Sequence, residues 1–293
     1  MSLRIMTNIT VESANTLLTH LLAELSYPAS PQHFQRYGSW VDSEGVRDAL
    51  TASLRPEVFE LFGGAELPKW NEIRDATTHP LPETRGIYLD LIRGLDGRDR
   101  LYVGQSKNVA FRISKCHMSF RHRRDNKSLH YFAIDRSKWN NFVVLAVLPP
   151  LADPALESRA DLVMNVLEMW CALLFRTLQG ETLGEWLPAG WVGHGTKGEN
   201  GMGMVCNWYP LNLKLPLDQG VATFEGGDWM TRLNASEDPL AREYAEGKRE
   251  LVDKGEKTSV EASLPTPPSV DVPSLLLGAM IGAVAVMFIT KRR

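Results

Sequence analysis

The chain has 293 residues, of which 44% are hydrophobic and 23% are charged, and its net charge is −3. This composition predicts one or two globular domains with a sizeable core, and the charge excludes a uniformly basic nucleic-acid-binding protein. The three cysteines, Cys116, Cys171 and Cys206, are far apart and form no Cys-x-x-Cys pair. They argue against a disulfide framework and a structural zinc site, and they favour a reducing compartment.

Residues 1–78 are predicted to be a helical N-terminal region. Apolar residues recur at helical spacing over 11–25, and further short helices are expected over 46–62. The first 22 residues lack a basic segment followed by an unbroken apolar run, so we expect no secretory signal. The region contains no recognisable chemistry and is interpreted as a substrate-facing subdomain or as scaffolding.

Residues 84–178 have the pattern of a small α+β domain. A strand is predicted over 84–92, a turn around Asp96-Gly97 and a second strand over 100–104. A helix over about 108–116, a strand over 141–148 and an apolar helix over 158–178 follow. Because strands and helices alternate irregularly, the order predicts the α+β class.

Residues 216–271 are predicted to be an extension and a linker. Within it, residues 236–271 mix charges of both signs and are rich in proline near their end. Such a composition favours disorder, with a short helical stretch around 240–254. We expect the linker to let the globular body work at a distance from the membrane surface.

Residues 272–290 contain no charged residue and are followed by the basic tail 291–293. As a helix they would span roughly 28 Å, close to the about 30 Å hydrocarbon core of a bilayer. The segment predicts a single C-terminal membrane anchor, with the body facing the cytosol, in the ER or outer mitochondrial membrane; the alternative is a buried core helix. Gly278 and Gly282 have the small-xxx-small spacing that permits weak self-association, although glycine is common in membrane helices.

Four sets of residues in the body have the order of a known nuclease motif. Gly86-Ile87-Tyr88 is followed by Tyr102-Val103-Gly104, then by Arg112 on a predicted helix and by Glu168 within the apolar helix. This ordered set resembles the GIY-YIG nuclease family over residues 79–215, about half of the chain. The resemblance implies an antiparallel three-stranded sheet flanked by helices.

The resemblance also implies a metal-dependent endonuclease that hydrolyses phosphodiester bonds in DNA or RNA. One divalent ion, Mg²⁺ or Mn²⁺, would be held by Glu168 and water. Tyr88 or Tyr102 would activate or orient the attacking water, and Arg112 would contact the phosphate.

Each of these side chains also has a purely structural interpretation, which for Arg112 is a solvated helix residue. A buried carboxylate costs several kcal/mol unless it is paired, protonated or bound to a metal, so Glu168 could instead form an ion pair with Arg112 or Arg176. Tyr88 and Tyr102 could be core tyrosines with their hydroxyl groups at the surface. A tyrosine base at neutral pH would need a nearby cation, because its ordinary pKa is about 10.

Three features depart from the family pattern. The family often has His or Tyr four residues after its Arg, where this chain has Cys116; His117, about 100° further round a helix, would serve only at a bulge or a helix end. The long interval before Glu168 implies an insertion over 119–140, a possible substrate clamp. The family's Asn is assigned to Asn207 in preference to Asn212, and either could be an ordinary turn residue.

Seven cations are concentrated within 107–127, against one acid, Asp125. They predict a nucleic-acid-binding patch, and the alternative is a solvated loop. The residues are Lys107, Arg112, Lys115, Arg121, Arg123, Arg124 and Lys127.

Three functions are therefore consistent with the sequence. The first is a membrane-tethered endonuclease with Tyr88, Tyr102, Arg112, His117, Glu168 and Asn207 as its catalytic set. The second is a catalytically inactive domain of the same fold that binds nucleic acid or protein at a membrane. The third is a tail-anchored adaptor whose N-terminal helices carry the function.

Overall fold

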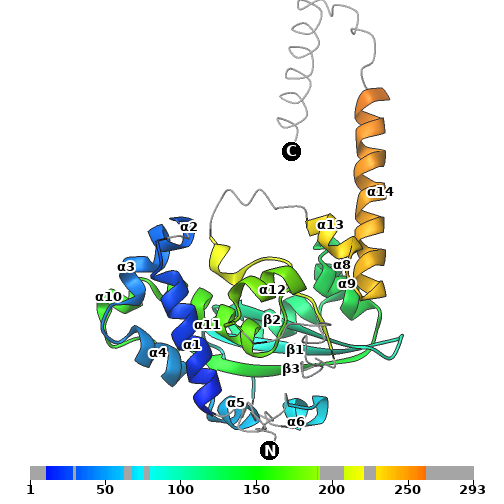
Figure 1. Ribbon diagram of the computed structural model, residues 1–293. Coiled ribbons are helices and arrows are strands. Elements are labelled where there is room, and N and C mark those ends of the chain that lie inside the picture. Colours follow the sequence, from blue (N-terminus) through cyan, green and yellow to red (C-terminus); the bar gives the residue numbers. More distant parts are fainter. Residues whose placement is uncertain are drawn as a thin grey trace, which may run out of the picture. The chain divides into compact units, whose positions relative to one another are not determined.

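The computed structural model describes residues 11–28, 31–62, 68–75, 80–189, 191, 208–220 and 229–261. The chain divides into two compact units, Met1–Tyr244 and Ala245–Arg293. The first unit contains the whole sheet and its core (Figure 1). Of the second unit, the described part is the C-terminal portion of one helix.

The expected anchor, residues 272–290, lies outside the described residues, as do Gly278 and Gly282. In the part of the chain that is described, no helix has both the length and the apolar character needed to cross a bilayer. The membrane tether thus stays a prediction.

Most of the described elements are short helices around one sheet. The helices before the sheet are α1 (Val11–Leu25), α2 (Pro31–His33), η1 (Phe34–Gly38), α3 (Ser39–Val41), α4 (Val46–Ser53), α5 (Pro56–Leu61) and α6 (Trp70–Asp75). Those within and after it are α7 (Val109–Phe111), η2 (Arg112–His117), α8 (Phe120–Asp125), α9 (Leu129–Asp135), α10 (Pro154–Glu157), α11 (Ala160–Leu174), α12 (Gly180–Trp186), η3 (Pro216–Asp218), α13 (Trp229–Asn234) and α14 (Pro239–Glu261). The helix expected around 240–254 is therefore longer than the sequence indicated.

The sheet has four strands in the order β3-β1-β2-β4. β1 (Gly86–Gly94) pairs antiparallel with β2 (Asp99–Ser106) and with β3 (Ser137–Val147). The two-residue β4 (Tyr209–Pro210) adds parallel to β2. The α+β class is confirmed, but the expected sheet of three antiparallel strands is wrong in number and direction, because a segment too short to show any alternation joins the β2 edge.

The β1–β2 hairpin turns where Asp96-Gly97 predicted it. The Asp96 carboxylate accepts a hydrogen bond from the Arg98 amide at 3.1 Å, and Gly97 has a φ of +76°, which glycine adopts without strain. The resulting register places Tyr88 opposite Gly104 and Asp90 opposite Tyr102. Tyr88 and Tyr102 are thus diagonal neighbours on one face of the sheet.

The two faces of the sheet have different environments. The alternate β1 residues Ile87, Leu89 and Leu91 join the large core that includes α11, whereas Tyr88 joins a small cluster with Val109 of α7. Because both faces are covered, β1 is buried along almost its whole length. The predicted catalytic tyrosines therefore face away from α11.

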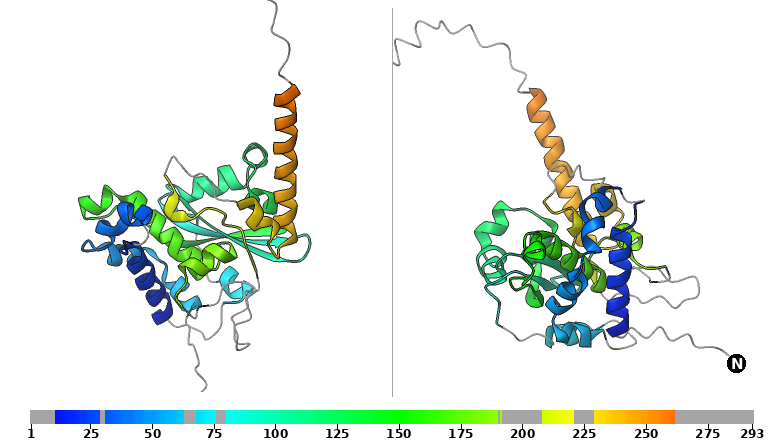
Figure 2. Two further views of the ribbon diagram at one scale, coloured as in Figure 1. Left: turned by 45° about the horizontal axis from the view of Figure 1, so that its top comes forward. Right: turned by 90° about the vertical axis from the view of Figure 1, so that its left-hand side faces the viewer.

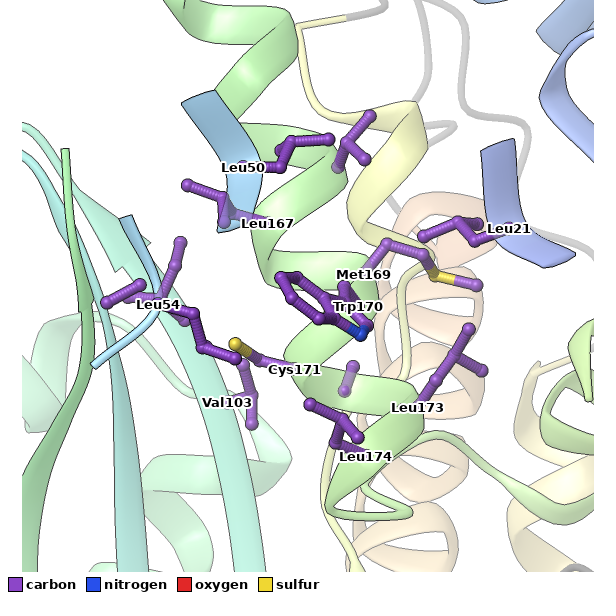
Figure 3. Packing of buried hydrophobic residues seen from close by; sticks show 14 of the residues in the cluster. Leu21, Leu50, Leu54, Val103, Leu167, Met169, Trp170, Cys171, Leu173 and Leu174 are labelled. Carbon is purple, nitrogen blue, oxygen red and sulfur yellow. The ribbon is translucent and has the colours of Figure 1, made fainter. Parts of the chain in front are cut away.

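Helix α11 is the centre of the large core. Every residue in it except Asp161 is buried, as expected of a helix that is apolar on all sides. Trp170 packs among leucines of α11 and of the N-terminal helices (Figure 3), and its indole N–H donates to the Ala14 carbonyl of α1 at 3.0 Å. The contact between α1 and α11 can also be followed in the two views of Figure 2. The predicted helices over 11–25 and 46–62 thus share one core with the sheet.

A buried ion pair between Arg100 and Asp238 joins the segment after α13 to the sheet. The Arg100 guanidinium of β2, fully buried, donates to the Asp238 carboxylate at 2.7 and 2.6 Å. Asp238 also accepts from the Leu240 amide at 3.1 Å, at the start of α14. A second carboxylate, Asp96, completes the arginine's partners.

Candidate active site

The two glycines of the motif are required by close packing rather than by the backbone angles. A Cβ at Gly104 would lie 2.6 Å from the Tyr88 Oη and 2.8 Å from the Tyr102 Cε1. A Cβ at Gly86 would lie 2.4 Å from the Ala146 carbonyl oxygen on β3. Gly104 therefore makes room for the two phenol rings, whose centroids are 6.4 Å apart, and Gly86 makes room for β3.

A π-helical turn brings His117 to Tyr88. Residues Arg112–His117 form a π-helix, in which the Met118 amide donates to the Ile113 carbonyl five residues back. The wider turn directs the buried His117 towards the sheet, and its Nε2 lies 2.7 Å from the Tyr88 Oη. Cys116 stands four residues after Arg112, but it is His117 that contacts the tyrosine.

Arg112 is the second polar partner of Tyr88. Its guanidinium is partly buried and forms a hydrogen bond with the Tyr88 phenol. Burial acts to lower the pKa of Arg112, but the neighbouring phenols, Tyr88 first, outweigh it and hold the pKa above its ordinary value. Arg112 is therefore a permanent cation beside the phenol.

The hydrogen-bond geometry indicates which way the Tyr88 proton points. Since Arg112 can only donate, the Tyr88 oxygen accepts from it, and the Tyr88 O–H is left to donate to the His117 Nε2. Burial lowers the pKa of His117 to about 2, so the imidazole is neutral and able to accept. The proton is then on Nδ1, a buried atom without a partner among the described residues.

Burial opposes ionisation of both phenols. It raises the pKa of Tyr88 and of Tyr102 well above the ordinary value, with Arg112 acting in the opposite direction. Neither tyrosine is therefore a free base at neutral pH in this state. Any proton abstraction by Tyr88 must be coupled to the release of its own proton.

The sequence did not indicate a second histidine in the site. His130 of α9 stacks on the Tyr102 ring, with centroids 3.9 Å apart and planes 11° apart, and its Nε2 lies 2.8 Å from the Asp90 Oδ2. Both groups are buried; burial raises the pKa of Asp90 and lowers that of His130 to about 3. No local motif could have revealed this pair, because its members are 40 residues apart. The insertion expected as a clamp thus supplies, through α9, part of the wall of the site.

Glu168 approaches from the other side of β2. It projects from α11, is 2% exposed, and accepts hydrogen bonds from the side-chain amides of Gln105 and Gln219. Burial raises its pKa to about 8, and the two amides only partly oppose this effect. The alternative ion-pair partners do not take this place, since Arg112 contacts Tyr88 and Arg176 contacts the Leu173 carbonyl and the Trp191 ring.

The structure therefore brings the predicted residues together in two groups. Tyr88, Tyr102, Arg112 and His117 are in contact on one face of the sheet. Glu168 lies on α11, which packs on the opposite face of the sheet, and its negative charge adds to the larger effect of burial in raising the pKa of Tyr102 and of Tyr88. The carboxylate is thus within electrostatic range of the phenols.

A strap formed by residues 216–219 covers Glu168, and the N-terminal helices hold it in place. The Tyr37 Oη donates to the Leu217 carbonyl at 2.7 Å, and Arg36 donates to the Leu217 and Gln219 carbonyls at 3.0 and 2.6 Å. His33 contacts Asp218 at 3.0 Å. Residues 31–41, for which the sequence indicated no chemistry, therefore determine where the Gln219 amide sits.

Glu168 offers an oxygen ligand to a hard divalent cation. Its carboxylate is a ligand that Mg²⁺ accepts together with water, whereas Gln105 and Gln219 present amide nitrogens to it in this state. Among the described residues, no three His, Cys, Asp or Glu side chains gather as a metal cluster. A cation here would thus depend on one carboxylate and water.

The predicted basic patch is only partly available to a ligand. Lys107, Lys115, Arg121 and Arg124 are exposed, with Arg124 2.9 Å from Asp125. Arg123, expected to bind nucleic acid, is instead largely buried. It pairs with Asp135 at 2.8 Å and donates to the His117 carbonyl at 2.8 Å, so its side chain supports the π-helical turn.

Only one of the two asparagine candidates lies within the described residues. Asn207, the preferred one, lies outside the described residues. Asn212 is buried, and its side chain accepts from the Val103 amide at 2.9 Å and donates to the Val103 carbonyl at 2.7 Å. Asn212 thus pairs with the β2 backbone as a further strand would.

Comparisons of the chain with protein families, with curated protein sequences and with solved structures find no match. The likeness to the GIY-YIG nucleases therefore depends on the motif residues and on their arrangement. The function has to be argued from the chemistry of the site.

Proposed function

We propose that the protein is a metal-dependent endonuclease of the GIY-YIG type, which hydrolyses phosphodiester bonds in nucleic acid. The observation that supports this most directly is the position of the Tyr88 hydroxyl between the Arg112 guanidinium and the His117 imidazole, 2.7 Å from Nε2. A phenol that has a donor on one side and a neutral acceptor on the other is arranged to transfer a proton.

The proposed step is a concerted proton relay. As a water molecule attacks phosphorus, it gives a proton to the Tyr88 oxygen, while Tyr88 passes its own proton to the His117 Nε2. The P–O bond to the leaving strand breaks, the leaving oxygen takes a proton from solvent water, and His117 returns its extra proton to solvent. Arg112 balances the negative charge that develops on the phenol and the phosphate. Because burial disfavours a free phenolate, the concerted route is the one the site supports.

A divalent cation bound at Glu168 would neutralise charge on the phosphate and on the leaving oxygen. At neutral pH the Glu168 carboxyl is largely protonated, because its pKa is about 8. A cation there would take the place of the carboxyl proton and of the Gln219 amide N–H as the partner of Glu168. Tyr102 and His130, stacked on each other, form the neighbouring wall.

The second candidate is an inactive binding domain of the same fold. The covered state of Glu168 favours it, since the carboxylate is 2% exposed and bonded to Gln219. The exposed cations Lys107, Lys115 and Arg121 would still bind phosphates.

Cleavage assays separate the two. The full-length protein is incubated with plasmid, branched DNA and RNA in Mg²⁺ or Mn²⁺, and wild type is compared with Tyr88→Phe, Arg112→Ala and Glu168→Gln. Tyr88→Phe keeps the ring and removes only the relay oxygen, so we expect at least a 100-fold loss of cleavage with little loss of binding. Tyr27→Phe, at an exposed position, is the matched control.

Equal cleavage by wild type and Tyr88→Phe would rule out the relay. Salt-sensitive binding without cleavage by any form would favour the inactive domain. Loss of cleavage in Tyr88→Phe and Glu168→Gln together, with Tyr27→Phe active, supports the nuclease.

A further inference from the structure

The helical segment 109–117 has one side in the site and one side in solvent. Val109, Ile113 and His117 are buried against the sheet. Phe111 and Lys115 are exposed one turn apart on the outer side, and Met118 continues it. The segment that supplies Arg112 and His117 to the site therefore also has an outward face.

This outward face is unusually apolar. Six large hydrophobic residues are exposed in the described part of the chain, and three of them, Phe111, Met118 and Phe120, fall within ten consecutive residues. Their exposed fractions are 60%, 57% and 67%. Such a concentration of exposed apolar side chains is typical of a binding surface rather than of ordinary solvent-facing positions.

Most charges around these side chains are positive. Residues 107–124 include six Lys or Arg and no acid, and the next residue, Asp125, lies 4.0 Å from Arg121 and 2.9 Å from Arg124. Lys107, Lys115 and Arg121 are exposed in this stretch. Aromatic rings interleaved with cations match a partner that has flat apolar groups on an anionic backbone.

We propose that Phe111, Met118 and Phe120, with Lys107, Lys115 and Arg121, form a surface that binds unpaired nucleotides beside the proposed active site. The aromatic and thioether side chains contact base faces, and the cations contact phosphates. Duplex DNA exposes its phosphates but keeps its base faces stacked, so it uses only the cations. The substrate class that follows, single-stranded or locally unpaired nucleic acid, rests on the proposed nuclease function, whereas the binding surface does not.

The test is fluorescence anisotropy of the full-length protein with a labelled oligothymidylate and with a labelled duplex of equal length. It is carried out in EDTA, so that cleavage plays no part. For the double variant Phe111→Ala/Phe120→Ala we expect binding of the oligothymidylate to weaken at least tenfold, because two aromatic rings that contact bases are removed. Duplex binding should change less than about threefold, since its phosphate contacts are unaffected.

Leu95→Ala is the matched control, because Leu95 is 74% exposed on the β1–β2 hairpin turn, outside the 107–124 segment. It should leave both probes unchanged. Lys107→Ala/Lys115→Ala should weaken both probes and flatten the dependence of affinity on salt, as loss of phosphate contacts does. Since all these positions are exposed, thermal unfolding should match wild type within error.

Two outcomes would overturn the proposal. One is unchanged oligothymidylate binding in the double phenylalanine variant. The other is binding of phosphatidylserine vesicles that the double variant loses while oligothymidylate binding persists, which would make this a lipid-binding surface. If the protein binds the oligonucleotide through these residues but never cleaves it, the binding surface is supported and the proposed nuclease function is wrong.

Discussion

Replacing Glu168 with glutamine should change how the stability of the protein depends on pH. The carboxyl is 2% exposed, and burial raises its pKa in the folded state to about 8. In the unfolded chain the group has an ordinary pKa, about 4.3. Glutamine keeps the size of the side chain and an amide that can bond to Gln105 and Gln219, but it does not titrate.

The sign follows from which state binds more protons. Between the two pKa values the folded protein holds the Glu168 proton and the unfolded chain does not, so the stability that the proton contributes is lost as pH rises through about 8. From about pH 5.5 to about pH 8 the loss is about 3 kcal/mol. For a chain of this size that corresponds to a fall in Tm of roughly 6–12 °C.

Differential scanning calorimetry of both proteins across this range isolates the effect, because all other titrating groups are common to the two. The Tm of wild type should fall relative to that of Glu168→Gln as the pH rises, and Mg²⁺ or Mn²⁺ at the upper pH should restore part of it in wild type alone. Parallel Tm curves would mean that the carboxyl titrates normally. The assignment of Glu168 as an unbalanced buried acid would then be wrong.

Three other substitutions test the frame of the site. Gly104→Ala should displace the Tyr88 ring and cost about 1–3 kcal/mol of unfolding free energy by overpacking, with a loss of activity that exceeds the loss of stability; a fully stable and active variant contradicts the close contact. Asp238→Ala leaves the buried Arg100 guanidinium with one carboxylate partner and should destabilise by about 3–5 kcal/mol in urea unfolding. Asp96→Ala, which removes the more exposed partner on the hairpin turn, should cost less than half of this. Asn212→Leu leaves the buried Val103 amide and carbonyl of β2 without hydrogen-bond partners, so we expect a loss of about 2–5 kcal/mol in unfolding free energy. A change below about 1 kcal/mol would show that water replaces the asparagine side chain.

The hairpin and the central helix were predictable because their patterns are local. Asp96-Gly97 determines a turn from two adjacent residues, and the apolar stretch of α11 is continuous in sequence. The register that makes Tyr88 and Tyr102 neighbours then follows from the turn. These features need no information from distant parts of the chain.

The remaining features of the site depend on contacts between distant segments. The Asp90–His130 pair and the Glu168–Gln219 contact join residues 40 and 51 positions apart, and neither residue of a pair has a local pattern that identifies the other. The strand β4 is two residues long and contains a proline, so it lacks both alternation and one backbone donor. Sequence patterns of fixed period cannot reveal such contacts.

The π-helical turn allows the number of residues between Arg112 and His117 to change during evolution. An extra residue between Arg112 and His117 is absorbed as a widened turn, and the exposed Ser114 lies within it. Removing that one residue would return the segment to an ordinary α-helix with the imidazole four positions after the arginine, on the same side. An ancestor and a descendant could thus differ in length here and keep the same pair of groups against the phenol, so counting positions from Arg112 is a poor guide to kinship at this point.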